Sequence, residues 1–286
     1  MNKIMKKQEK IAESPIYEFS VDQAKVSLSL GNTKIGRMIN WSTLPGNESN
    51  KLIAKGRIIT NVEGTCSENC KSCFKTCYAR RSILQHHNSV TKAWAENTLM
   101  IRHNTAACFA EIDRKIMEAN KKFYETKNPS DLKFELFRIN VSGEIQTLEE
   151  LESWNQLASK HPEIKFGIYS KNAPILLAFF KKHGQTADNF CINISEWHGC
   201  MAHVIDELHA LGAKFNVFEY NDTNMASSKA SLAEKERFAH MASCPAVGPT
   251  KDTKHPINPK TGETWHCADC QACYRKTGTH RFVYSH

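Results

Sequence analysis

The chain has 286 residues, of which 41% are hydrophobic and 24% are charged, which is enough to bury the core of one large domain or of one domain with an appendage. The basic first residues lack the apolar stretch of a signal peptide, and the apolar run at 173–180 is too short to span a bilayer. We therefore expect a cytoplasmic protein without membrane contact. The net charge of +8 permits nucleic acid as a partner without requiring it.

The composition changes along the chain and suggests three parts. Residues 1–20 form a basic N-terminal segment. Residues 21–243 show the alternating apolar patterns of a folded α/β domain. Residues 244–286 are rich in Pro, Gly, Lys and Thr, so we predict an irregular segment that its cysteines organise.

The first distinctive stretch is "GTCSENCKSCFKTCYAR" at residues 64–80. Its cysteines are Cys66, Cys70, Cys73 and Cys77. Thiols stay reduced in the cytoplasm, where clustered cysteines more often bind metal or carry out redox chemistry than form disulfides. Two upstream runs, 24–31 and 56–62, have the composition of strands, and the second ends just before this cluster.

From residue 91 onward, helical and strand periods alternate. A long helical stretch over 91–125 is followed by a strand at 132–141, and Thr147 with Glu150 forms the capping-box signature of the next helix. The cycle repeats with strands at 165–170, 189–195 and 214–220 and helices at 173–184, 200–212 and 228–242. This alternation predicts an α/β fold with parallel strands, and the absence of a dinucleotide-binding glycine motif favours a partial (β/α) barrel.

Polar residues follow the predicted strands where barrel enzymes place functional groups. Arg138 lies within one strand, and a buried arginine needs an anionic partner such as a cofactor carboxylate, a substrate phosphate or the nearby Glu135. Glu144 follows that strand, and Lys171 and Ser195 come at the ends of the next two.

The second cysteine group lies near the C-terminus. Cys267, Cys270 and Cys273 are separated by two residues each, and Cys244 lies upstream before Pro245. Bacterial ferredoxins hold a [4Fe–4S] cluster with this arrangement, whereas zinc sites usually pair two separated C-x2-C knuckles. Iron is therefore favoured, with zinc as the alternative metal.

Taken together, these features resemble the radical S-adenosylmethionine superfamily. Cys66-x3-Cys70-x2-Cys73 matches its cluster spacing, and "SGE" at Ser142, Gly143 and Glu144 falls on its cofactor-binding motif after the second strand. The resemblance implies an open-iron [4Fe–4S] cluster and an auxiliary one, S-adenosylmethionine as cofactor, and flavodoxin or ferredoxin as electron donor. It also implies cofactor-binding roles for these residues: Ser142, Gly143, Glu144, Arg138, Lys171 and Ser195.

A closer resemblance, over about residues 30–275, is to the phage and plasmid gene product 88 family. The matching segments are "GNTKIG" at 31–36, "CYA" at 77–79 and "FRINVSGE" at 137–144. In that family's pattern the cysteines corresponding to Cys66, Cys73 and Cys77 stand out, so Cys70 or Cys77 is left open as the further ligand of the first cluster.

Two functions follow as hypotheses. The preferred one is a radical S-adenosylmethionine-like enzyme acting on a small-molecule or macromolecular substrate. The alternative is a phage-associated iron–sulfur or zinc protein that binds nucleic acid or a host partner without catalysis, for which the basic charge is the supporting feature.

Overall fold

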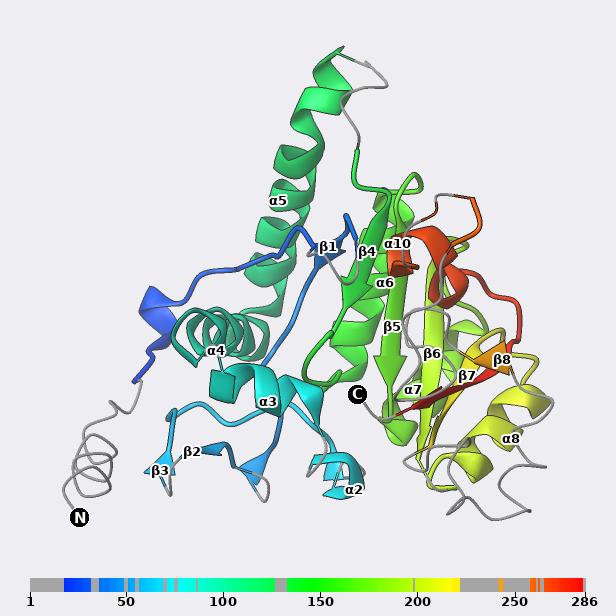
Figure 1. Cartoon of the computed structure of the whole chain (residues 1–286), viewed down its shortest axis with the longest axis horizontal. Coiled ribbons are helices and arrows are strands. Elements are labelled where there is room, and N and C mark those ends of the chain that lie inside the picture. The colour runs from blue at the N-terminus through cyan, green and yellow to red at the C-terminus, as the bar shows by residue number, and fades with distance from the viewer. Residues whose placement is uncertain are drawn as a thin grey trace.

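The structure is a computed structural model of the whole chain (Figure 1). The residues it describes are 18–31, 36–48, 51–54, 57–68, 71–74, 77–85, 87–126, 133–197, 199–221, 242–243, 258–260, 262 and 265–284. Within these ranges, no helix combines the length and the apolar character needed to cross a bilayer.

Helices and strands alternate through the middle of the chain. The helices are η1 (Val21–Gln23), α2 (Lys71–Phe74), α3 (Tyr78–Gln85), α4 (His87–His103), α5 (Thr105–Thr126), α6 (Leu148–Lys160), α7 (Ala173–His183), α8 (Ala202–Ala210), α10 (Cys267–Cys270) and η4 (Ala272–Tyr274). The strands are β1 (Ile39–Asn40), β2 (Ile53–Ala54), β3 (Arg57–Ile58), β4 (Leu136–Ile139), β5 (Lys165–Ser170), β6 (Phe190–Trp197), β7 (Asn216–Asn221), β8 (Ala242–Ser243) and β9 (His280–Tyr284).

One sheet dominates the described part of the chain. Its seven strands lie in the order β1-β4-β5-β6-β7-β9-β8, and every pairing within it is parallel. From β1 to β7 the spatial order follows the chain order, as expected when each strand is followed by a helix that returns the chain to the next position. The predicted α/β fold with a parallel sheet is therefore confirmed.

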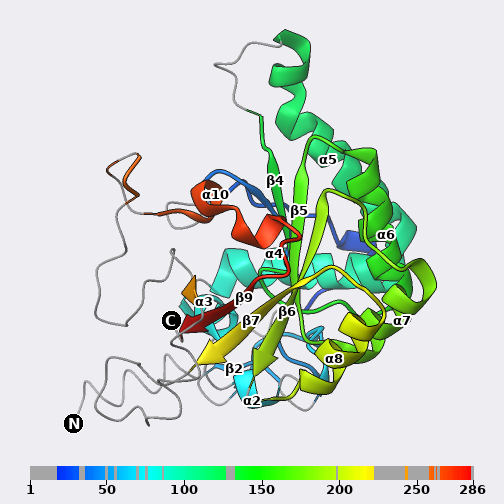
Figure 2. The same ribbon diagram turned by 90° about the vertical axis from the view of Figure 1, so that its right-hand side faces the viewer.

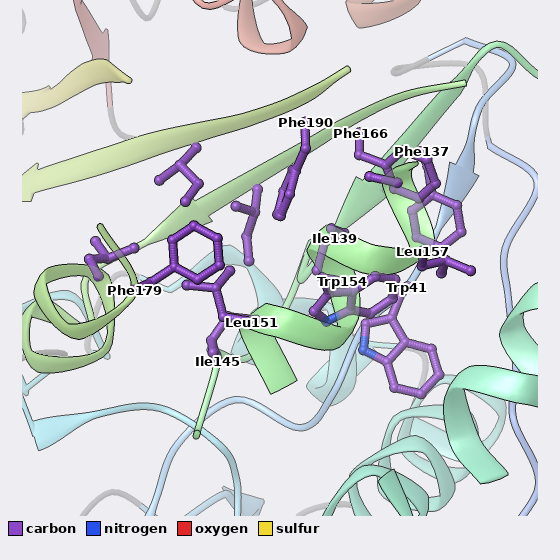
Figure 3. Packing of buried hydrophobic residues seen from close by; sticks show 14 of the residues in the cluster. Trp41, Phe137, Ile139, Ile145, Leu151, Trp154, Leu157, Phe166, Phe179 and Phe190 are labelled. Carbon is purple, nitrogen blue, oxygen red and sulfur yellow. The ribbon is translucent and has the colours of Figure 1, made fainter. Parts of the chain in front are cut away.

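One face of this sheet carries the main hydrophobic core. Alternate strand residues such as Phe137, Ile139 and Phe166 point toward α5, α6, α7 and α8, and α6 contributes Leu151 and Trp154 (Figure 3). The Trp154 ring packs edge-on against Trp41, with 6.0 Å between ring centroids. Strand residues alternate between faces, so the intervening positions must form a second, different surface.

That second surface, which we call the inner face, is mainly polar and aromatic. It carries Arg138, Tyr169, Asn193 and Asn216, and α10 and η4 lie on the side of the sheet opposite α5 to α8 (Figure 2). The inner face is therefore covered in part by the C-terminal cysteine-bearing segment rather than by a helical layer.

Several predicted elements are confirmed with small changes in their bounds. The strand at 165–170 is β5, and the Thr147 hydroxyl accepts a hydrogen bond from the Glu150 amide at the start of α6. The long helical stretch is two helices, α4 and α5. Most of the helix predicted over 228–242 lies outside the described residues, and Ala242 at its end belongs to β8.

Other expectations need correction. Residues 24–31 form no strand and make one isolated bridge, Ser29 to Asn40, and β3, within the predicted strand at 56–62, pairs antiparallel with β2 in a separate small sheet. The C-terminal segment was expected to be irregular, yet its described part contains α10, η4 and β9. Polar side chains of the inner face bind the backbone carbonyls of this segment, and β9 pairs with β7.

Candidate functional site

The first cysteine loop is fixed to the strand extension beyond β1. The Thr65 amide donates to the Leu44 carbonyl at 2.9 Å, and the Cys66 amide donates to the Gly46 carbonyl at 2.9 Å. The Gly46 amide in turn donates to the Cys66 sulfur at 3.0 Å. An amide donor stabilises a sulfur that carries negative charge, as a metal-bound thiolate does.

Arg102 of α4 holds the same loop from the other side. Its guanidinium donates to the carbonyls of Glu63 and Gly64 at 2.7 and 2.8 Å and to Gln146 at 2.8 Å. The loop is also tightly packed, because a Cβ on Gly64 would lie 2.0 Å from the Gly46 carbonyl oxygen. The backbone leading into Cys66 is thus held by several groups.

The other cysteines of this group are placed only in part. Cys73 is buried within α2, Cys77 lies just before α3, and its amide donates to the Phe74 carbonyl at 3.4 Å. Cys70 lies outside the described residues. The choice between Cys70 and Cys77 as a ligand therefore stays a prediction.

The predicted Ser-Gly-Glu motif packs directly against the first cysteine loop. The Glu144 amide donates to the Thr65 hydroxyl at 2.8 Å, and the Thr43 and Thr65 hydroxyls are hydrogen bonded at 2.8 Å. Gly143 has a φ of 84°, and a Cβ there would lie 1.9 Å from the Thr43 hydroxyl oxygen. Only glycine fits at this contact, which brings the turn after β4 beside Cys66.

Glu144 itself is buried and bound to backbone amides. One carboxylate oxygen accepts from the Ile145 amide at 2.9 Å and the other from the Lys171 amide at 2.7 Å. These bonds connect the turn after β4 to the end of β5. The structure thus gives Glu144 a bridging role between two strand ends.

Arg138 lies on the inner face, on strand β4. Its guanidinium lies 5.1 Å from the Tyr169 ring centroid, and its Nε is buried without a hydrogen-bond partner among the described residues. Burial alone would lower the pKa of Arg138. The neighbouring Tyr78, Tyr169 and Cys267 raise the pKa by more than burial lowers it, so the net pKa lies above the usual value for arginine. Arg138 therefore stays charged.

Glu135 is not the partner of this arginine. It lies 4.0 Å from the Lys133 ammonium group, and its side chain is 59% exposed. The groups that interact most strongly with Arg138 are phenols and a thiol rather than carboxylates. The expectation that Glu135 is the partner of Arg138 is thus wrong. The two other expected partners, a cofactor carboxylate and a substrate phosphate, stay predictions.

Tyr78 connects the first cysteine loop to Arg138. Its hydroxyl donates to the Val141 carbonyl just beyond β4. Tyr78 is 40% exposed as a whole, and desolvation at its hydroxyl end raises its pKa. The charge of Arg138 opposes that rise, while Cys77 and Cys267 add to it. The same phenol thus interacts with cysteines from both groups.

The second cysteine group reaches the inner face through η4. The Tyr169 hydroxyl lies 2.7 Å from the Cys273 sulfur, and Tyr274 packs over Gly167, where an added Cβ would lie 2.9 Å from its ring. Cys267 and Cys273 both contact the small cluster of Met38, Leu136 and Tyr274. Cys244 lies outside the described residues.

Two buried asparagines hold this segment on the sheet. Asn193 donates to the Cys273 carbonyl at 2.9 Å, and Asn216 donates to the Arg275 carbonyl at 2.9 Å. Neither asparagine is among the site residues predicted from the sequence. Their signal was the alternation of polar residues with apolar ones in strands β6 and β7, which marks a polar face opposite the core.

Lys171 and Ser195 also lie toward this face. The Lys171 ammonium is 5.3 Å from the Trp197 ring centroid, and Trp197 stacks on Tyr220 with 3.5 Å between centroids. The Trp197 indole donates to the Ser195 hydroxyl at 3.2 Å. The structure therefore groups Arg138, Lys171 and Ser195 around one side of the sheet.

The structure describes nine of the eleven cysteines of the chain. The described cysteines are reduced thiols, and among the described residues no three His, Cys, Asp or Glu side chains are arranged to hold one metal ion. Cys108 and Cys191 are unsuited as ligands, since burial raises the pKa of both thiols, that of Cys191 to about 12.

A glycine-containing segment near β1 completes the site. Gly31 has a φ of 99°, and an added Cβ would lie 2.2 Å from the Gly36 carbonyl oxygen. At Gly36, with a φ of 78°, a Cβ would lie 2.9 Å from the Ala268 Cβ of α10. The two glycines thus allow this segment to pack against the helix that contains Cys267 and Cys270.

Comparison of the chain with known proteins gives one family match. A family model described as gene product 88 matches residues 24–276. No match was found among curated proteins or among solved structures. Since the family model spans most of the chain, the protein belongs to the gene product 88 family.

Proposed function

We propose that this protein is an iron–sulfur enzyme of the radical S-adenosylmethionine type, with the parallel sheet as a partial barrel around its site. The observation that carries the proposal is the position of Arg138. Its guanidinium lies 5.1 Å from the Tyr169 ring, and the Tyr169 hydroxyl is 2.7 Å from the Cys273 sulfur of the second cysteine group. Tyr78, next to the first group, donates to the Val141 carbonyl just beyond the strand that contains Arg138. An anionic cofactor between the two groups would neutralise Arg138.

The ligands would come from both cysteine groups. Cys66 and Cys73, with Cys70 or Cys77, would hold the first [4Fe–4S] cluster, and the C-terminal set of Cys244, Cys267, Cys270 and Cys273 would hold the second. When bound, a cluster with an open iron supplies the electron that cleaves the sulfonium of S-adenosylmethionine. The hydrogen bond from the Gly46 amide to the Cys66 sulfur fits a cluster ligand, because hydrogen bonds to the ligand sulfurs help to set the reduction potential of a cluster.

The chain's own residues would bind and orient the organic part of the cofactor. Arg138 supplies a positive charge beside the Tyr169 ring on the inner face. Lys171 supplies a second charge at the end of β5. The proposed enzyme would receive electrons from a donor such as flavodoxin or ferredoxin. It would bind its substrate near the strand ends.

The decisive test compares Cys73→Ala with Cys108→Ala in protein purified without oxygen. We expect the spectrum of the reduced wild-type protein to change when S-adenosylmethionine is added, and the cofactor to be cleaved. Cys73→Ala should lose both responses, and Cys108→Ala should keep them because Cys108 lies in the core away from the site. Cofactor cleavage by iron-reconstituted Cys73→Ala would contradict the proposal.

The alternative, a nucleic-acid-binding iron–sulfur protein without catalysis, is supported by the net charge of +8. It predicts an affinity for DNA or RNA that falls steeply with salt concentration. It also predicts no spectral response to S-adenosylmethionine. The same preparation therefore separates the two functions.

A further inference from the structure

A group of buried polar atoms at the carboxyl ends of β1 and β4 has no hydrogen-bond partner among the described residues. The atoms are Asn40 Oδ1, Arg138 Nε, both amide atoms of Asn140, and Ser142 Oγ. Asn40 and Asn140 are each 5% exposed and Ser142 is 3% exposed. Buried polar groups in folded proteins almost always have a hydrogen-bond partner, so several unsatisfied ones in one place indicate a missing partner.

The positions of these residues show that the atoms belong to one site. The β1–β4 register pairs Asn40 with Arg138. Two residues earlier on each strand, Met38 and Leu136 pack with Tyr274 on the inner face, so Asn40 and Arg138 also lie on that face.

Asn140 follows at the end of β4 with a φ of 49°, a left-handed conformation that is uncommon for a residue other than glycine. Such backbone positions persist where the surrounding structure imposes them and are often found at binding sites. Here the conformation accompanies a buried side-chain amide whose nitrogen and oxygen both have no partner among the described residues.

The unsatisfied atoms include both donors and acceptors. Arg138 Nε, the Asn140 amide nitrogen and the Ser142 hydroxyl can donate, whereas Asn40 Oδ1 and Asn140 Oδ1 can accept. A phosphate offers mainly acceptors and would leave the two asparagine oxygens unsatisfied. An α-amino acid head group offers a carboxylate to the donors and an ammonium group to the acceptors.

We propose that Asn40, Arg138, Asn140 and Ser142 bind the α-amino and carboxylate groups of an amino-acid-type ligand. For the identity of the larger molecule the inference rests on the proposed function, since S-adenosylmethionine carries this head group. The ammonium group contacts the asparagine oxygens, because these acceptors have no partner among the described residues, whereas each Glu144 oxygen already accepts one backbone amide.

The test is calorimetric titration of the full chain with S-adenosylhomocysteine, which has the head group, and with adenosine, which lacks it. We expect S-adenosylhomocysteine to bind at least about tenfold more tightly than adenosine. Asn140→Gly should weaken its binding by about tenfold or more. The same variant should leave the melting temperature of the unliganded protein unchanged or higher, because glycine tolerates the positive φ and an unsatisfied amide is removed.

Asn172→Ala is the matched control. Its amide donates to the Ile145 carbonyl at 2.8 Å at the same end of the sheet, so its removal should lower the melting temperature and leave the affinity within about threefold. Ser142→Ala replaces Asn140→Gly if that variant fails to fold. Equal binding of adenosine, unaltered binding by the variants, or no binding of S-adenosylhomocysteine overturns the inference.

Iron measured in the same sample separates this inference from the proposed function. Head-group binding by protein that acquires no iron would support the amino-acid site and contradict the radical mechanism. Protein that contains iron but does not bind the head group would contradict the amino-acid site alone.

Discussion

At the scale of single residues, Glu150 makes the stability of the fold depend on pH. Burial raises its pKa from 4.5 to about 7, with Glu144 adding to the rise and Arg102 opposing it. The stabilising contribution of the protonated acid is complete below pH 4.5 and is lost as pH rises through about 7.

We expect the free energy of unfolding of the wild-type protein to fall by roughly 3 kcal/mol across that pH range from this group. Glu150→Gln keeps an oxygen to accept the Gln146 amide and removes the charge. Urea unfolding at several pH values should therefore show a flatter profile for this variant. An unchanged profile would mean that Glu150 does not control the pH dependence.

Gly143 is the second residue whose substitution has a defined effect. An alanine Cβ would collide with the hydroxyls of Thr43 and Thr65 and would also occupy a positive φ. We expect Gly143→Ala to lower the free energy of unfolding by about 3 kcal/mol. Gly184→Ala is the control, because Gly184 has a φ of 73° but open space around it, so about 1 kcal/mol is expected. Equal losses would argue against the packing of the turn on the cysteine loop.

At the scale of elements, the attachment of the C-terminal segment depends on Asn216. It donates to the Arg275 carbonyl and accepts the Thr279 amide at 3.2 Å. Asn216→Ala should destabilise the protein by about 1–3 kcal/mol and increase hydrogen exchange in η4 and β9.

Asn189→Ala provides the comparison for this variant. The Asn189 amide nitrogen lies within hydrogen-bond distance of three carbonyls, those of Ala158, His161 and Ile164, at the end of α6 and in its connection to β5. Its loss should increase exchange there and leave η4 protected. The same exchange pattern for both variants would show that the segment is not held by Asn216.

Elements with strong local signals could be predicted from the sequence. The capping box at Thr147, the strand at 165–170 and the glycine after α7 all depend on neighbouring residues alone. Strand β1 has two residues and exists because its backbone pairs with Arg138 and Phe137, far along the chain. Strand β9 likewise depends on β7, so no local pattern identifies either.

At the scale of the whole molecule, the sequence indicated which residues matter but not how they meet. Arg138, Lys171 and Ser195 were identified from their places in strands or at strand ends. The proximity of Cys77 and Cys267 to the same tyrosine depends on packing between segments almost two hundred residues apart, which no spacing within the chain reveals. Tyr169, Asn193 and Asn216 were missed because polar strand residues were treated as ordinary.

The central claim is that both cysteine groups hold iron–sulfur clusters beside Arg138. Its most direct test is the iron and acid-labile sulfide content of the full chain purified without oxygen. Two cubane clusters predict a brown protein with about eight iron and eight sulfide per chain, falling to about half when Cys273 is replaced by alanine. A colourless protein that contains zinc, or no metal at all, would contradict the claim.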